Sequence, residues 1–216
     1  MAGAFDPEDI VDDERVGLEH VDAADDDVED DDDFEDDDFD DEDADDDLED
    51  ATDEDIDFVV ALYREDGAPT VVPLEADLAN DLEELIAQLL RLPGDAGSLG
   101  FVSINRDVLV AVRVRGPRHV QVLTSDIYYS DVWPIVRDVA DYLGVEPGED
   151  DTPEDGPVGD LGMFASQGLK EEGLEALCLE EDELASDELA ERIARAIHFD
   201  PDQFSKVIDD YWGGED

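Results

Sequence analysis

Positive charge, cysteine and histidine are all scarce in this sequence. It has 12 lysine and arginine residues against 69 aspartate and glutamate residues, which gives a formal net charge of −57. Nucleic-acid binding depends on neutralising phosphates with lysine and arginine, so this composition argues against direct contact with nucleic acid. It argues against binding to anionic membrane surfaces for the same reason. The partners that it favours are basic: a cationic protein, a polyamine or a loosely held divalent metal ion.

The lone cysteine, Cys178, excludes an intramolecular disulfide, and with only three separated histidines it excludes a zinc site of the usual kind. The best match to a calcium-binding loop, at residues 43–48, has Leu48 where a glycine is required. We therefore expect no defined metal site and no cofactor. No apolar run approaches the roughly 20 residues that span a bilayer, and no basic-plus-apolar signal segment is present. These features predict a cytoplasmic protein.

Catalytic motifs are also lacking. The sequence contains no G-x-S-x-G elbow and neither of the common glycine-rich phosphate loops. The histidines, His20, His119 and His198, have no partners at metal or triad spacing, so we expect them to be structural or solvated. The sequence therefore predicts a protein that is not an enzyme, and an enzyme of unrecognised type is the least favoured alternative.

The first 57 residues hold 33 of the acidic residues and a single arginine. Blocks of like charge repel one another and bury too little apolar surface to offset the entropy of folding. The pattern predicts a disordered acidic tail over residues 1–57. Phe34 and Phe39 interrupt this tail and are candidate partner-binding residues, since charge would steer them to a basic surface where the rings could be buried. The alternative is that both rings are incidental.

Residues 58–145 are predicted to form an α+β domain. Buried or alternating apolar residues indicate strands, and apolar residues spaced three and four apart indicate helices. The predicted strands are at 58–64, 70–72, 99–104, 108–115 and 119–124. One predicted helix follows an N-cap at either Asp77 or Asn80-Asp81 and is ended by Pro93-Gly94. The other runs from Ser125 to Gly144, with Pro134 as either a break or its first turn. This β-β-α-β-β-β-α order predicts an antiparallel sheet that carries helices. It is similar to the topology of longin-like and roadblock-like domains.

The rest of the chain is predicted to be a linker and a small helical region. Residues 146–160 are rich in proline, glycine and acid, as linkers are. Within residues 161–216, apolar spacing predicts helices at about 171–179, 184–197 and 201–211. The sequence leaves open whether these helices pack on the sheet or on a partner.

One local cluster of positive charge is expected near the turn at residues 116–117. Arg113 and Arg115 alternate onto one face of a predicted strand, and Arg118 and His119 begin the facing strand. Arg113, Arg115 and Arg118 are therefore candidate partner-binding residues for an anion or a protein. The alternatives are pairing with the chain's own acids or docking of its acidic tail.

Three stretches carry a resemblance to a known family: VALYREDG, DLEELIAQLLRLPGDAGSLGFVSINRDVLVAVRVRG and VLTSDIYYSDVWPIVRDVADYLGV. Together with the C-terminal GDLGMFASQGLKEEGLEALCLEEDELASDELAERIARAIHF, they resemble the actinobacterial tRNA adenosine deaminase-associated proteins over residues 58–210. The resemblance implies a partner, the deaminase, and no catalytic residues. The chain is not itself a zinc deaminase, which requires H-x-E and P-C-x-x-C.

The resemblance leads to a hypothesis of a non-catalytic accessory protein of the tRNA adenosine deaminase. In this hypothesis the folded part docks on the enzyme, and the acidic tail covers or competes for its tRNA-binding surface. The alternative is an acidic solubility or chaperone-like module that binds unrelated cationic proteins. Oligomeric state is left open by the sequence.

Overall fold

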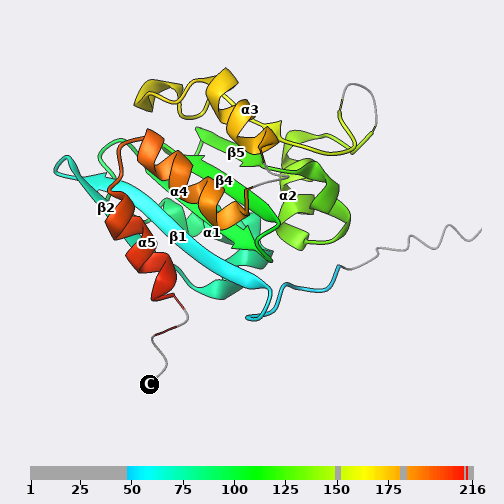
Figure 1. The fold of residues 1–216 in the computed structure, drawn as a ribbon, viewed down its shortest axis with the longest axis horizontal. Coiled ribbons are helices and arrows are strands. Elements are labelled where there is room, and N and C mark those ends of the chain that lie inside the picture. Colours follow the sequence, from blue (N-terminus) through cyan, green and yellow to red (C-terminus); the bar gives the residue numbers. More distant parts are fainter. Residues whose placement is uncertain (1–47, 149–151, 181–183, 212, 214–216) are drawn as a thin grey trace, which may run out of the picture. The chain divides into compact units, whose positions relative to one another are not determined.

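A computed structural model describes residues 48–148, 152–180, 184–211 and 213 of the chain (Figure 1). Most of the predicted acidic tail, with Phe34 and Phe39, lies outside the described residues. The candidate calcium loop at 43–48 also lies outside them, except for Leu48.

The described residues form an α+β fold around one antiparallel sheet, as the sequence predicts. The strands lie in the order β2-β1-β3-β4-β5-β6, and every neighbouring pair is antiparallel. Their bounds are β1 Ile56–Glu65, β2 Ala68–Pro73, β3 Ser98–Ile104, β4 Val108–Val114, β5 Val120–Thr124 and β6 Val158–Gly159.

The two-residue strand β6 was not predicted and lies within the expected linker. It pairs with the end of β5, Leu123 opposite Gly159 and Thr124 opposite Val158. Gly159 permits this close approach, because a side chain there would come within 2.3 Å of the backbone oxygen of Val122. This strand therefore forms because it pairs with β5, and no local sequence pattern predicts it.

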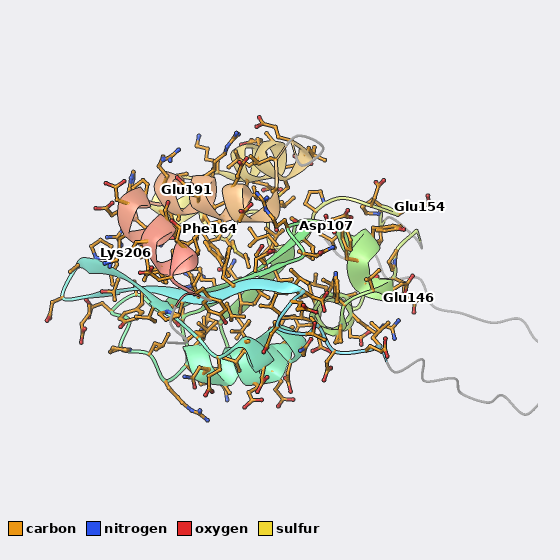
Figure 2. The ribbon with its side chains drawn as sticks, turned by 60° about the horizontal axis from the view of Figure 1, so that its bottom comes forward. Asp107, Glu146, Glu154, Phe164, Glu191 and Lys206 are labelled. Carbon is orange, nitrogen blue, oxygen red and sulfur yellow. The ribbon has the colours of Figure 1, made fainter. Side chains whose placement is uncertain are left out.

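Helices cover both faces of the sheet. On one face lie the short 3₁₀ helices η1 (Ala76–Asn80) and η2 (Ile127–Asp131) with α1 (Leu82–Leu89) and α2 (Pro134–Leu143). On the other lie η3 (Ala165–Gln167), α3 (Glu171–Leu179), α4 (Ser186–Ala196) and α5 (Pro201–Asp209). Figure 2 shows the sheet between these two sets of helices.

Local sequence signals set where the helices begin. Of the two predicted N-caps, Asp81 caps α1, since its carboxylate accepts the backbone N–H of Glu84, and the residues around Asp77 form the separate η1. Pro134 occupies the first turn of α2, where its missing N–H costs nothing. Gly144 ends α2 in the left-handed conformation.

The C-terminal helices pack on the sheet, which answers the question that the sequence leaves open. Strand β1 is apolar on both faces, and its residues Phe58, Val60 and Leu62 belong to the same buried cluster as the apolar faces of α3, α4 and α5. Phe204 of α5 meets the rings of Phe58 and Phe101 edge-on, with centroids 6.1 and 6.3 Å apart.

Candidate functional site

The described arginines divide into two groups by what they bind. Four form ion pairs with carboxylates: Arg106 with Asp187, Arg137 with Asp131, Arg192 with Glu180 and Arg195 with Glu191. The other five form no ion pair with a described residue: Arg64, Arg91, Arg113, Arg115 and Arg118. Because acids outnumber bases more than fivefold in the chain, pairing would be the ordinary outcome for an exposed arginine.

These five arginines lie at one end of the sheet, which we call the arginine end. In the register of the sheet, Tyr63 pairs with Ser98, Ser98 with Val114, and Val114 with Val120. Arg64 directly follows Tyr63 along the chain, and Arg115 directly follows Val114. Arg91 lies in the segment leading into β3, and Arg118 lies in the turn between β4 and β5.

Arg64 ties the sheet to the end of α4. Its guanidinium group donates to the backbone oxygens of Ile197 and His198 at 3.2 and 3.0 Å. It also lies over the ring of Phe199, 4.9 Å from the centroid. A helix C-terminus carries partial negative charge, so a cation there is favourable. This arginine therefore has a structural role.

Arg113 is buried by the segment that precedes α3. Only 7% of the residue is exposed, and its guanidinium group donates to the backbone oxygen of Met163 and to the Ser166 hydroxyl. Burial lowers the pKa of Arg113, and the nearby charge of Arg115 lowers it further. Strand alternation predicted Arg113 and Arg115 on one face, but β4 ends at Val114, before Arg115. The sequence did not predict that a distant segment covers Arg113.

Arg115 and Arg118 are exposed, as is His119. The backbone N–H of Arg115 donates to the His119 oxygen at 3.0 Å, and its guanidinium group donates to the Gln121 side chain at 3.2 Å. Of the predicted cluster, Arg115 and Arg118 thus remain at the surface, where binding of a partner stays a prediction.

A groove runs beside Arg115, with a volume of about 650 Å³, which we call the arginine groove. Arg113 and Arg115 line it together with apolar residues that include Leu90, Leu92 and Pro117. Leu90 is 40% exposed, so the groove has an uncovered apolar wall. One carboxylate, that of Asp95, lies in the groove and accepts the backbone N–H of Gly67 at 3.2 Å.

The floor of the groove requires a glycine. Gly97 has a φ of +89°, and a side chain there would come within 2.1 Å of the backbone oxygen of Val114. The adjacent Ser98 donates its hydroxyl to the backbone oxygen of Leu89 at 2.7 Å. These contacts hold the segment before β3 against the end of β4.

A second surface, between α1 and α2, has the opposite charge. A cleft of about 620 Å³ is lined by four acidic residues, Asp81, Glu83, Asp138 and Asp141, and by Tyr142, which is 52% exposed. Asp138 accepts the backbone N–H of Leu82 at 3.0 Å, and burial raises the pKa of Asp138. We call this the acidic cleft. Sequence reasoning missed it because its acids come from two helices whose packing was not predicted.

A third polar cluster is a structural tie. The Ser103 hydroxyl donates its one proton to the Asp57 carboxylate at 2.8 Å, so the Ser186 hydroxyl, 2.7 Å away, donates to the Ser103 oxygen. The backbone N–H of Arg106 donates to the same carboxylate. The cluster joins β1, β3 and α4 through buried hydroxyls. Nucleophilic catalysis instead requires a base beside an accessible serine.

In the parts of the chain that the structure describes, no three side chains of histidine, cysteine, aspartate or glutamate converge to hold a metal ion. None of the described helices is long and apolar enough to cross a membrane. Cys178 belongs to α3, and its side chain is buried in the core.

The described residues therefore form an α+β fold with two charged surfaces, one acidic and one lined by arginine. The chain matches the model of the Rv3753c-like tRNA adenosine deaminase-associated protein family over residues 57–200, and it belongs to that family. This confirms the resemblance found in the sequence. No curated protein and no solved structure matches the chain. The matched region contains both surfaces, whereas nearly all of the predicted acidic tail lies outside it.

Proposed function

We propose that this protein is a non-catalytic accessory protein that binds a tRNA adenosine deaminase and regulates its access to tRNA. Its family is described by association with that enzyme. The observation that carries the regulatory part is the charge of the chain, with 33 acidic residues and one arginine in residues 1–57. The proposal places the protein in the cytoplasm with its enzyme.

The physical basis is electrostatic complementarity. A surface that holds tRNA must be basic, because it neutralises phosphates with lysine and arginine. A dense run of carboxylates fits such a surface and competes with RNA for it. Phe34 and Phe39 would then add apolar contacts on the enzyme. The acidic cleft supplies further carboxylates and the exposed ring of Tyr142, which can stack on a cationic side chain.

The test is calorimetric titration of the deaminase into this protein at ~150 mM salt, where the Debye length is about 8 Å. The control is a full-length variant in which every aspartate and glutamate of residues 25–47 is replaced by asparagine or glutamine. Truncation at residue 57 is unsuitable, because Ile56 begins β1 and the backbone of Ala51 is hydrogen-bonded to the Asn80 side chain. The neutralised variant leaves these contacts intact.

Saturable binding with a fixed stoichiometry supports the accessory role, and its loss in the neutralised variant assigns the contact to the acidic run. A competition assay with labelled tRNA then tests regulation, since the native chain must displace tRNA and the neutralised variant must not. Equal binding of hen lysozyme would favour the acidic chaperone-like alternative. The absence of binding by either protein form refutes physical association.

A further inference from the structure

We infer that the arginine groove is a second protein-binding site, and that it takes a short peptide segment of a partner that carries both acidic and large apolar side chains. This inference goes beyond the proposed function, because it concerns a surface of opposite charge to the one that would meet the deaminase. It rests on the described residues of the arginine end alone.

The exposed arginines at this end of the sheet keep their charge available. Arg91 and Arg115 donate to uncharged glutamine side chains, of Gln88 and Gln121, at 3.1 and 3.2 Å. Neither of them, nor Arg118, forms an ion pair with a described carboxylate. Guanidinium groups bind carboxylates in a two-pronged geometry that neutral amides do not satisfy. The cluster is therefore suited to carboxylates supplied from outside.

The groove combines apolar residues with two arginines, Arg113 and Arg115, and one carboxylate, that of Asp95. Leu90, Leu92 and Pro117 line it beside Arg115, and Leu90 is 40% exposed. A volume of about 650 Å³ lies within the range of sites that hold small ligands and large side chains. An apolar wall beside Arg115 matches a segment in which an apolar residue neighbours aspartate or glutamate.

The charge around the groove favours a short peptide over a nucleic acid. At physiological salt, charges more than about 8 Å away are largely screened, so a short ligand experiences mainly the local arginines. A long RNA would extend over the acidic remainder of this chain, whose net charge is −57. A phosphate backbone would also make no apolar contact with Leu90 and Leu92, which line the groove. These features favour the short acidic peptide.

The site is also held in place before binding. Gly97 allows the floor to approach the backbone of Val114, and Ser98 is bonded to the oxygen of Leu89. Arg113, which lines the groove, is held by hydrogen bonds to Met163 and Ser166. A preformed site avoids part of the ordering cost of association.

The test is an array of 12-residue peptides, each with four to six aspartate or glutamate residues and one or two of leucine, phenylalanine or tryptophan, probed with the full-length protein. Peptides that bind are then measured by fluorescence anisotropy. The double variant Arg115→Gln/Arg118→Gln should weaken binding at least tenfold. The matched control, Arg192→Gln/Arg195→Gln, removes two exposed arginines of α4 and should change binding less than twofold.

Two further probes separate the contributions. Leu90→Ser should weaken peptide binding severalfold, whereas a polyglutamate peptide without apolar residues should bind more weakly than the selected peptides. The inference is overturned if no array peptide shows binding that depends on Arg115 and Arg118. It is also overturned if a 12-nucleotide single-stranded RNA binds more tightly than the peptides and loses binding in the same double variant, which would make the groove a nucleic-acid site.

Discussion

Phe204 is the residue through which docking of the C-terminal helices can be tested most directly. Its side chain is fully buried, and it meets the rings of Phe58 and Phe101 edge-on at 86° and 72°. Replacing a buried phenylalanine by alanine costs about 3–5 kcal/mol, from lost burial and the cavity left behind. Domains of this size unfold with about 5–15 kcal/mol, so Phe204→Ala should remove a large share of the total stability.

A second substitution separates the ring contacts from simple burial. Phe204→Leu keeps most of the apolar volume but loses two edge-to-face pairs, each worth about 0.5–1.5 kcal/mol, and should therefore cost about 1–3 kcal/mol. Lys206→Ala, on the exposed side of the same helix (Figure 2), should change stability by less than about 0.5 kcal/mol.

The assay is urea unfolding of the full chain, followed by far-ultraviolet circular dichroism and by tryptophan fluorescence. Because the C-terminal helices and the sheet share one apolar core, both signals should report a single transition that Phe204→Ala shifts to lower urea. The reasoning fails if Phe204→Ala costs less than about 1 kcal/mol. It also fails if helix signal is lost in a separate early transition while the main transition is unmoved.

Three other substitutions test single contacts. Burial raises the pKa of Asp57 above its usual 3.8. The folded protein therefore favours the protonated carboxyl, and this contribution to the free energy of unfolding is complete below pH 3.8. It is lost as the pH rises through the pKa that Asp57 has in the folded protein. Asp57→Asn should thus be more stable than the native chain at pH 7 in urea unfolding, with an advantage that shrinks toward pH 4; a constant difference would contradict this cause. Gly97→Ala should destabilise the chain by at least about 1–3 kcal/mol, because its side chain would meet the Val114 oxygen, and an unchanged thermal midpoint would refute this. Asn80→Ala should cost about 1–2 kcal/mol by loss of two hydrogen bonds to Ala51, and should speed amide exchange at Ala51.

The elements that the sequence predicted are those whose pattern is local. Strand β4 has four valines that alternate onto one face, and Gly144 ends α2, so short-range rules suffice for these features. The predicted helix at 125–144 is interrupted, because residues 127–131 form η2 and α2 begins only at Pro134. Strand β6 has no such pattern, since it consists of Val158 and Gly159 within a stretch rich in proline, glycine and acid. It exists because β5 offers an edge with which it can pair, and an edge is a property of the assembled sheet.

The same distinction explains the arginines. Strand alternation placed Arg113 and Arg115 on one face, and nothing in that pattern shows how far another segment extends over the face. The segment carrying Met163 and Ser166 covers Arg113, whose guanidinium group is then satisfied by a backbone oxygen and a hydroxyl. Arg115 lies two residues further along and remains exposed. The covering segment thus reaches Arg113, which stabilises the fold, and leaves Arg115 exposed. In the inference above, Arg115 is the arginine that binds a carboxylate of a partner.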